Sequence, residues 1–270
     1  MQKRHKNRTL YFHEQVQTSR KYFIPYIGKF KQLDPGCRIL EIGCGDGGNL
    51  LPFAQMGCYT LGVDIDEGRI ADARKFFNDS EAKGDFIASD VFLLRELHGL
   101  FDVIICHDVI EHICDKQCFL SLISQFLARD GIIFMSFPAW QMPFGGHQQV
   151  CKSVVISHLP FIHFLPKECF RLFLKAFGEN ESCIKELMSI RETRTPIERF
   201  ERVLNRLALF NIIDRTLWLI NPHYETKFGL HPHQLSKWLG AIPHFRNYFT
   251  TSCFYVLSKK EVRGANGLDR

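Results

Sequence analysis

Residues Arg38 to Gly48 read RILEIGCGDGG, an apolar strand that runs into a glycine-rich turn. Gly43, Gly45 and Gly47 follow Glu41 at two-residue steps. Because glycine has no Cβ, such a turn brings backbone amides close to a ligand that any larger residue would push away. Ligands of open parallel sheets bind beyond the carboxyl ends of the strands. The segment therefore predicts an α/β fold that holds a nucleoside-type ligand at this edge.

Two classes of cofactor fit these glycines. Gly43, Gly45 and Gly48 also spell G-x-G-x-x-G, the dinucleotide fingerprint. Asp64 follows about twenty residues later, where a nicotinamide-binding protein places the acid that binds its ribose. The glycine spacing alone therefore leaves NAD open as the cofactor.

The next hundred or so residues predict a regular alternation of helices and buried strands. Each predicted strand ends in polar residues: Asp64, then Ser89-Asp90-Val91, then the run HDVIEHI. The predicted elements are a helix over Asn49–Met56, a strand over Tyr59–Val63, a helix over Arg69–Asn78, and strands over Phe86–Ala88, Phe101–Cys106 and Gly131–Phe137.

The ordered run EIGCGDG, VDID, SDV, FDVIICHDVIEHI and GIIFMSFP resembles the class I S-adenosylmethionine-dependent methyltransferases, and in particular the group that includes the ubiquinone-pathway O-methyltransferases. The resemblance implies a Rossmann-like, doubly wound, seven-stranded and mostly parallel sheet with an antiparallel last strand. It also implies S-adenosyl-L-methionine as cofactor and a methyltransferase activity, EC 2.1.1.-.

The resemblance assigns roles to single residues. Asp64 would bind the ribose hydroxyls, Asp90 the exocyclic amine of the adenine, and the backbone of Val91 the rest of the adenine edge. Glu41 would lie near the methionine end, or would mainly pin the glycine loop. The full cofactor set is Glu41, Gly43, Cys44, Gly45, Asp64, Ile65, Asp90, Val91 and His107.

Methyl transfer to a hydroxyl needs a base, whereas a thiol or an amine needs less help. His147, His107 and His223 are the candidates. His147 comes first, because Gly145-Gly146 before it permits a tight turn that could aim the imidazole into the cleft. His107, at the end of a predicted strand, has the alternative role of lining the methionine pocket.

Asp108, Glu111 and His112 raise the question of a metal, because on a helix they would share one face. The similar E-x-x-E-H positions of the ubiquinone-pathway enzymes are associated with a divalent ion. Here Asp replaces the first Glu, and related metal-free enzymes also carry the E-H pair. We therefore predict no metal and retain the three residues as candidates.

The remainder of the chain predicts a helical insertion that covers the site. Amphipathic helices are expected over Lys167–Phe177 and Pro196–Phe210, and Tyr22–Phe30 should fold over the cofactor or pack on the sheet edge. A helix over Pro232–Leu239 and final strands over Phe245–Phe249 and Cys253–Leu257 should follow. The predicted divisions are an N-terminal helical segment (1–35), a cofactor-binding core (36–139), the insertion (140–221), the C-terminal part of the core (222–258) and a tail (259–270).

Composition limits the cellular setting. Ten cysteines in a chain of 270 residues without a small secreted scaffold predict reduced thiols in a cytoplasmic protein. No C-x-x-C pair is present, which argues against a zinc site of that type. We find no signal peptide near the N-terminus and no apolar run long enough to span a membrane.

Charge and aromatic content indicate which classes of partner and substrate the chain can bind. The net charge of +5 is modest and partly concentrated in Lys3, Arg4, Lys6 and Arg8, so a nucleic-acid partner is not expected. Twenty-five phenylalanines favour an apolar pocket or a lid that contacts a membrane peripherally. The predicted acceptor is a small molecule, methylated on oxygen and apolar, lipid-linked or glycan-linked. A nicotinamide-dependent oxidoreductase and a noncatalytic cofactor-binding protein are the alternatives, and the oligomeric state is open.

Overall fold

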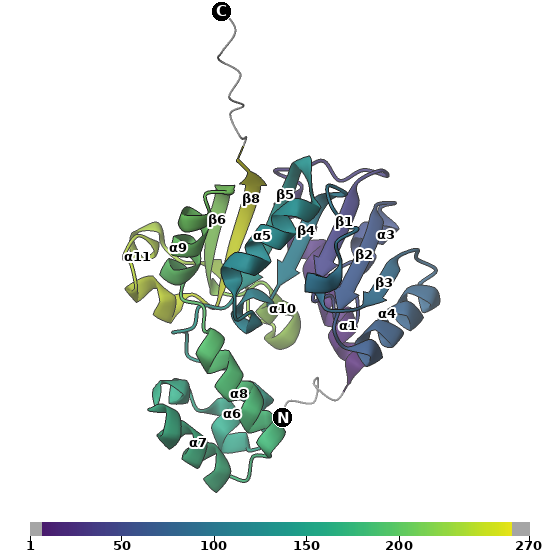
Figure 1. The fold of residues 1–270 in the computed structure, drawn as a ribbon. Coiled ribbons are helices and arrows are strands. Elements are labelled where there is room, and N and C mark those ends of the chain that lie inside the picture. The colour runs from purple at the N-terminus through teal and green to yellow at the C-terminus, as the bar shows by residue number, and fades with distance from the viewer. Residues whose placement is uncertain (1–6, 261–270) are drawn as a thin grey trace, which may run out of the picture.

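A computed structural model describes residues 7–260. One mixed sheet forms its centre (Figure 1). Its strands are β1 Arg38–Ile42, β2 Tyr59–Asp64, β3 Asp85–Ala88, β4 Phe101–His107, β5 Leu127–Phe137, β6 Phe210–Ile220, β7 His233–Gln234 and β8 Ser252–Lys259. They lie in the order β3-β2-β1-β4-β5-β8-β6-β7, with β1 to β5 parallel and β8 antiparallel to both β5 and β6. The predicted Rossmann-like fold is confirmed, with a two-residue β7 as an eighth strand.

Helices cover both faces of the sheet. They are α1 Arg8–Thr18, α2 Ile24–Ile27, α3 Leu51–Gln55, α4 Glu67–Asp79, α5 Lys116–Phe126, α6 Val154–His158, α7 Lys167–Ala176, α8 Glu181–Thr193, α9 Ile197–Leu207, α10 His223–Phe228 and α11 Lys237–Gly240. α1 continues through the π-helical turn Ser19–Phe23 into α2.

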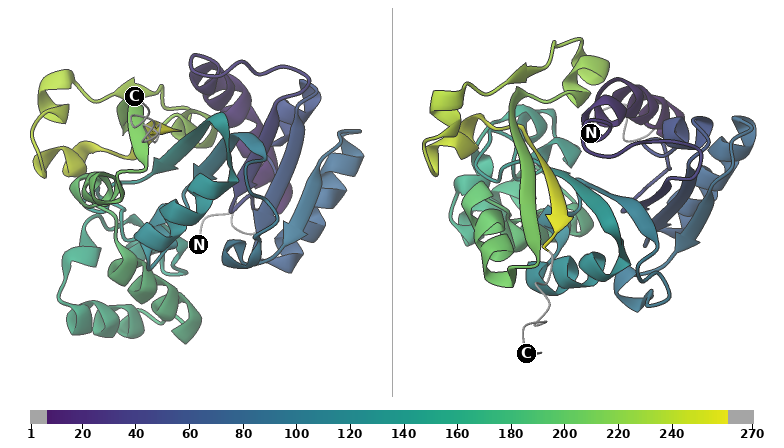
Figure 2. Two further views of the ribbon diagram at one scale, coloured as in Figure 1. Left: turned by 45° about the horizontal axis from the view of Figure 1, so that its top comes forward. Right: turned by 90° about the horizontal axis from the view of Figure 1, so that it is seen from above.

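The two faces have separate hydrophobic cores. Strand residues alternate between them, so Leu40 packs with α5 and α9, whereas the adjacent Ile39 packs with α1 to α4. Both side chains are fully buried. Figure 2 shows the N-terminal helices and α5 on opposite sides of the curved sheet. Burial on both faces explains why the parallel strands are continuous apolar runs in the sequence.

α6, α7 and α8 form a small subdomain beyond the carboxyl ends of the parallel strands, at the bottom of Figure 1. We call residues 140–195 the lid. The lid has a hydrophobic core of its own, which includes Ile156, Phe170 and Leu187. Lys116 Nζ ties its last helix to the main domain by donating to the carbonyl oxygen of Thr193 at 2.6 Å.

The sequence predicted that the helical insertion ends at Asn221, but in the structure it ends before α9. α9 packs on the sheet through Phe200 and Leu204, and Phe210–Ile220 forms β6. The amphipathic stripe of α9 correctly indicated burial, but such a stripe does not reveal which surface it packs against. β6 escaped notice because most of its side chains are exposed or half-buried.

The C-terminal region also differs from the prediction. Phe245–Phe249 is a 3₁₀ helix rather than a strand, and the predicted helix over Pro232–Leu239 is replaced by β7 and the start of α11. Arg246 explains the first difference, because its guanidinium donates to Glu198 Oε1 at 3.0 Å and Glu201 Oε2 at 2.9 Å. These contacts hold the segment against α9.

Other predictions concern the cysteines, membrane spans and the basic tail. All ten cysteines are free thiols, as predicted. Within residues 7–260 no helix is long and apolar enough to cross a bilayer. Lys3, Arg4 and Lys6 lie outside the described residues. Arg8 binds Asp72 on α4 and therefore helps to anchor α1.

Candidate functional site

The loop after β1 has a glycine backbone that other atoms can approach closely. Gly43, Gly45 and Gly47 have φ angles of 70°, 53° and 80°, which favour glycine. A Cβ on Gly43 would lie 2.5 Å from Cγ2 of Val109, in the loop after β4. The loop therefore leaves no room for a side chain at this position.

Asp64, at the end of β2, holds this loop from the side. Its Oδ2 accepts from the amide of Gly45 at 2.8 Å and its Oδ1 from the amide of Asp66 at 2.9 Å. Each carboxylate oxygen keeps a second lone pair. The side chain is only half-buried, so it both braces the loop and can accept hydrogen bonds from a ligand.

Glu41 lies beneath the loop and is almost completely buried. Its Oε1 accepts from Asn49 Nδ2 at 2.8 Å, while its Oε2 has no hydrogen-bond partner within residues 7–260. Burial raises the pKa of Glu41 to about 8, with the Asn49 hydrogen bond opposing the shift. One oxygen of Glu41 thus ties β1 to Asn49, after the glycine loop, and the predicted role of Glu41 toward a ligand stays a prediction.

The other predicted cofactor residues surround the same edge. Asp90 Oδ1 accepts from the amide of Phe92 at 3.0 Å, and Asp90 itself is exposed at the end of β3. Ile65 is highly exposed, whereas the side chains of Cys44 and Val91 are buried in the two cores. Cys44 and Val91 can therefore offer only backbone atoms to a ligand.

His107 ends β4 inside an aromatic cluster. Its Nδ1 hydrogen-bonds to Ser136 Oγ at 2.6 Å, and its ring contacts Phe23 and His223 edge-on at centroid distances of 5.0 and 6.5 Å. Burial lowers the pKa of His107. His223 is also hydrogen-bonded, since its Nδ1 lies 2.8 Å from Thr18 Oγ1. These two histidines connect the sheet, α1 and α10, which makes both less suited to a proton-transfer role.

His107 Nε2 lies 3.6 Å from Asp108 Oδ2, and His147 likewise has a carboxyl group as its polar neighbour. Its Nε2 lies 4.0 Å from Glu111 Oε1, and its ring meets that of His112 at 5.4 Å. Both carboxyl oxygens of Glu111 are buried and have no hydrogen-bond partner in the part of the chain that the structure describes. His147 itself has a left-handed backbone, with a φ of 60°, and keeps 23% of its side chain exposed.

Burial sets the charge state of this pair. It lowers the pKa of His147 to about 4, with His112 adding to the effect and Asp108 opposing it. It raises the pKa of Glu111 well above that of a normal glutamate, and Asp108 adds to this shift. Near neutral pH His147 is therefore an uncharged base, and Glu111 favours its protonated form.

Two tyrosines that the sequence did not single out share the electrostatic environment of Asp108. Burial raises the pKa of Tyr11, on α1, to about 12, and Asp108 adds to the shift. The same two causes raise the pKa of Tyr224, on α10, to about 12. Tyr11 also meets the ring of His223 at 6.4 Å. Helices from both ends of the chain thus line the space beside Asp108, a convergence that no local motif announces.

The predicted helical face of Asp108, Glu111 and His112 does not form. Asp108 has a φ of 54° and Ile110–His112 is a single 3₁₀ turn. These three residues are not among the potential metal-binding groups found in residues 7–260, where ligand atoms lie within 4.8 Å of one another. The lid attaches to this turn, because the hydroxyl of Thr193 donates to the Glu111 carbonyl oxygen.

Comparisons with known proteins agree with the geometry. Residues 33–159 match a family model described as a methyltransferase domain. The ubiquinone biosynthesis O-methyltransferase of Sinorhizobium medicae is 33% identical over 108 residues, covering 40% of this chain and 44% of that protein. The chain spans about half the length of the curated relatives it matches.

Solved structures share the fold at low sequence identity. A putative sarcosine dimethylglycine methyltransferase from Galdieria sulphuraria has a TM-score of 0.59 at 12% identity, covering 91% of this chain and 86% of that one. Magnesium protoporphyrin IX methyltransferase from Synechocystis PCC 6803, with bound S-adenosylhomocysteine, has a TM-score of 0.54 at 15% identity, covering 92% and 84%. The family match and such neighbours imply S-adenosyl-L-methionine as the cofactor, rather than the NAD that the glycine spacing left open.

Proposed function

Because the chain contains a class I S-adenosylmethionine-dependent methyltransferase domain, we propose that it methylates an oxygen of a small-molecule acceptor (EC 2.1.1.-). The observation that supports oxygen is the pairing of the uncharged His147 with Glu111 at the same sheet edge as the glycine loop. A hydroxyl must lose its proton for transfer, and this pair supplies a base for it.

The residues present fit the proposed cofactor. Gly43 and Gly45 leave space for its backbone contacts, and Asp64 and Asp90 offer carboxylate oxygens at the ends of adjacent strands. The free oxygen of Glu41 is the buried acceptor that a cationic amine requires. When bound, the cofactor supplies an activated methyl group together with its own leaving group.

The side chains on the acceptor side remove the proton of the acceptor and orient it. His147 accepts the acceptor's hydroxyl proton at Nε2 as the methyl group moves to the oxygen, and the carbonyl dipole of the protonated Glu111, whose Oε1 lies 4.0 Å from Nε2, stabilises the resulting imidazolium. Tyr11 and Tyr224, whose raised pKa values keep them protonated, can donate hydrogen bonds that orient the acceptor. The lid excludes water from this space.

Exposed aromatic residues beside the lid support an acceptor with an apolar, lipid-linked or glycan-linked part. Phe161, Phe164, Tyr248, Phe245 and Phe249 are exposed and connected by successive ring contacts. This aromatic row joins the lid to the segment before β8. It offers a surface for an apolar chain or for peripheral contact with a membrane.

The test combines binding with turnover. Calorimetry should give micromolar affinity for S-adenosylmethionine and S-adenosylhomocysteine and no response to NAD. Release of S-adenosylhomocysteine in the presence of phenolic or long-chain alcohol acceptors should then report transfer. His147→Ala should lower that rate by about 10²–10⁴-fold, the usual contribution of a general base, and leave cofactor affinity unchanged.

His158→Ala is the matched control, because His158 is exposed on α6 in the same lid. It should leave both readouts unchanged. Loss of cofactor affinity in His147→Ala would assign His147 to cofactor binding or to folding. Cofactor binding without transfer to any acceptor would favour the noncatalytic alternative.

A further inference from the structure

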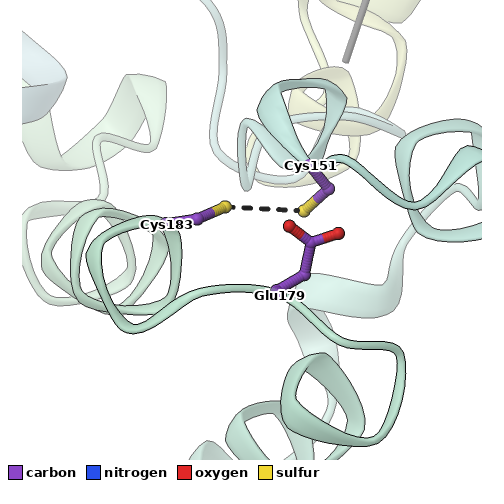
Figure 3. A group of neighbouring side chains, drawn as sticks. All are labelled: Cys151, Glu179 and Cys183. Atoms are coloured by element: carbon purple, nitrogen blue, oxygen red, sulfur yellow. Dashed lines mark hydrogen bonds between the residues drawn. The ribbon is translucent and has the colours of Figure 1, made fainter.

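Two thiols and a carboxylate meet inside the lid (Figure 3). Cys151 follows the turn after His147, Glu179 precedes α8, and Cys183 lies in the first turn of α8. Their ligand atoms all lie within 4.8 Å of one another, and Cys151 and Glu179 are buried. We propose that these three side chains bind one divalent cation of the zinc type, which fastens the two ends of the lid together.

The spacing of the sulfur atoms is the first support. Cys151 Sγ and Cys183 Sγ lie 3.9 Å apart. Two thiolates bound to one tetrahedral zinc, each about 2.3 Å from the metal, are separated by roughly 3.8 Å. A disulfide would bring the sulfurs to about 2.05 Å. The sulfurs are therefore too far apart for a disulfide, and the spacing at which the two thiols hydrogen-bond also suits two thiolates on one zinc ion.

The orientation of Glu179 is the second support. Its Oε1 accepts from the amide of Ser153 at 2.8 Å and its Oε2 from the amide of Lys152 at 3.0 Å. Each oxygen retains a lone pair, and such outer hydrogen bonds are what fix a ligating carboxylate. Both amides directly follow Cys151 in the chain. The same contacts that orient the carboxylate thus hold it beside the thiol.

The chemistry of the set selects the ion. Two sulfurs and one oxygen favour zinc over magnesium or calcium, which prefer oxygen ligands alone. Cys183 is only half-buried, so solvent can reach the site and supply a fourth ligand. Three protein ligands with one open position are a known zinc arrangement.

The size of the lid gives such an ion a role. Its core contains seven buried side chains, one of which is Cys151 itself: Cys151, Ile156, Ile162, Phe170, Leu174, Ile184 and Leu187. Cores this small commonly need a disulfide or a metal to supplement them. A cation at this place would close the chain between residues 151 and 179 around α6 and α7. It would thereby hold in place the segment that carries His147.

Cobalt titration of the reduced, metal-free full-length chain tests the site directly. We expect a thiolate-to-cobalt charge-transfer band that saturates at one equivalent and disappears when zinc is added. Zinc should also raise the unfolding temperature of the wild-type chain. Cys151→Ser and Cys183→Ser should lose the band, whereas Cys169→Ser, which alters an exposed thiol on α7 in the same lid, should keep it.

The wild-type titration does not depend on the folding of any variant, and circular dichroism checks the variants. Failure of the wild-type chain to bind cobalt or zinc stoichiometrically overturns the proposal. So does a charge-transfer band that survives in folded Cys151→Ser and Cys183→Ser. Peptide maps of zinc-exposed protein that show Cys151 joined to Cys183 by a disulfide would also overturn it, because a disulfide does not ligate zinc.

Discussion

At the scale of single residues, the site is defined by buried acids that lack a counter-ion. Glu41 and Glu111 are both almost completely buried, and both have oxygens that accept no hydrogen bond from the described residues, 7–260. A buried carboxyl group in this state is costly. In the proposed reaction each gains a partner: the cofactor's amine at Glu41 and the protonated His147 at Glu111. Asp108, beside Glu111, has a left-handed backbone with a φ of 54°.

Asp64 allows a test at this scale. Asp64→Ala should weaken binding of S-adenosylmethionine by about 1–3 kcal/mol, because it removes a ligand acceptor and leaves the amide of Gly45 unpaired. Calorimetry measures the change. The control is Asp79→Ala, at the exposed end of α4, which should bind like the wild-type chain. Equal affinity in Asp64→Ala and wild type would remove Asp64 from the cofactor site.

At the scale of elements, α9 separates the main domain from the lid. Phe200 is fully buried and meets the rings of Phe137 and Tyr255 at 4.9 and 5.0 Å. It therefore belongs to the core of the sheet. The lid begins after β5 and ends at the start of α9, so its helices α6 to α8 can be disturbed without exposing the sheet.

This boundary makes Phe200→Ala a global mutation. It should lower the free energy of unfolding by about 3–5 kcal/mol, the usual cost of removing a large aromatic ring from a packed core. Urea unfolding of the full chain measures the loss. Arg202→Ala changes an exposed side chain of the same helix and should stay within about 0.5 kcal/mol of wild type. If Phe200→Ala changed the free energy of unfolding only slightly, α9 would have to be assigned to the lid instead of the main domain.

At the scale of the whole molecule, the buried acids make stability depend on pH. The pKa of Glu41 is about 8 in the folded chain, above its ordinary value of 4.5. The folded state therefore holds the proton more tightly than the unfolded state, and this stabilisation is lost as the pH rises toward 8. Burial lowers the pKa values of His147 and His163 to about 4. These two residues therefore change the free energy of unfolding only below pH 6.5, the ordinary histidine pKa.

Between pH 6.5 and 8 the buried acids Glu41 and Glu111 thus determine how steeply the free energy of unfolding changes with pH. The free energy of unfolding of the cofactor-free chain should fall by up to about 1.4 kcal/mol per pH unit for each titrating acid. Glu41→Gln should make the decline shallower, whereas Glu168→Gln, at an exposed position, should leave it as in wild type. Urea unfolding at a series of pH values measures it. An unchanged slope in Glu41→Gln would show that Glu41 is ionised in the folded state.

The sequence by itself determined the cofactor half of the molecule. Each of its parts, from the glycine loop to Asp90, is a strand followed directly by the residues predicted to bind the cofactor, so local order carries the information. The sequence also put His147 forward as a base, because Gly145-Gly146 permits a tight turn before it, and that role stays a prediction.

Only the tertiary structure decided the acceptor half. Glu111 meets His147 across two loops, and Tyr11 and Tyr224 arrive from α1 and α10. No periodicity links residues so far apart in the chain. The same reason explains the misplaced end of the insertion: an amphipathic stripe shows that α9 is buried, but its partner is chosen by long-range packing of the whole chain.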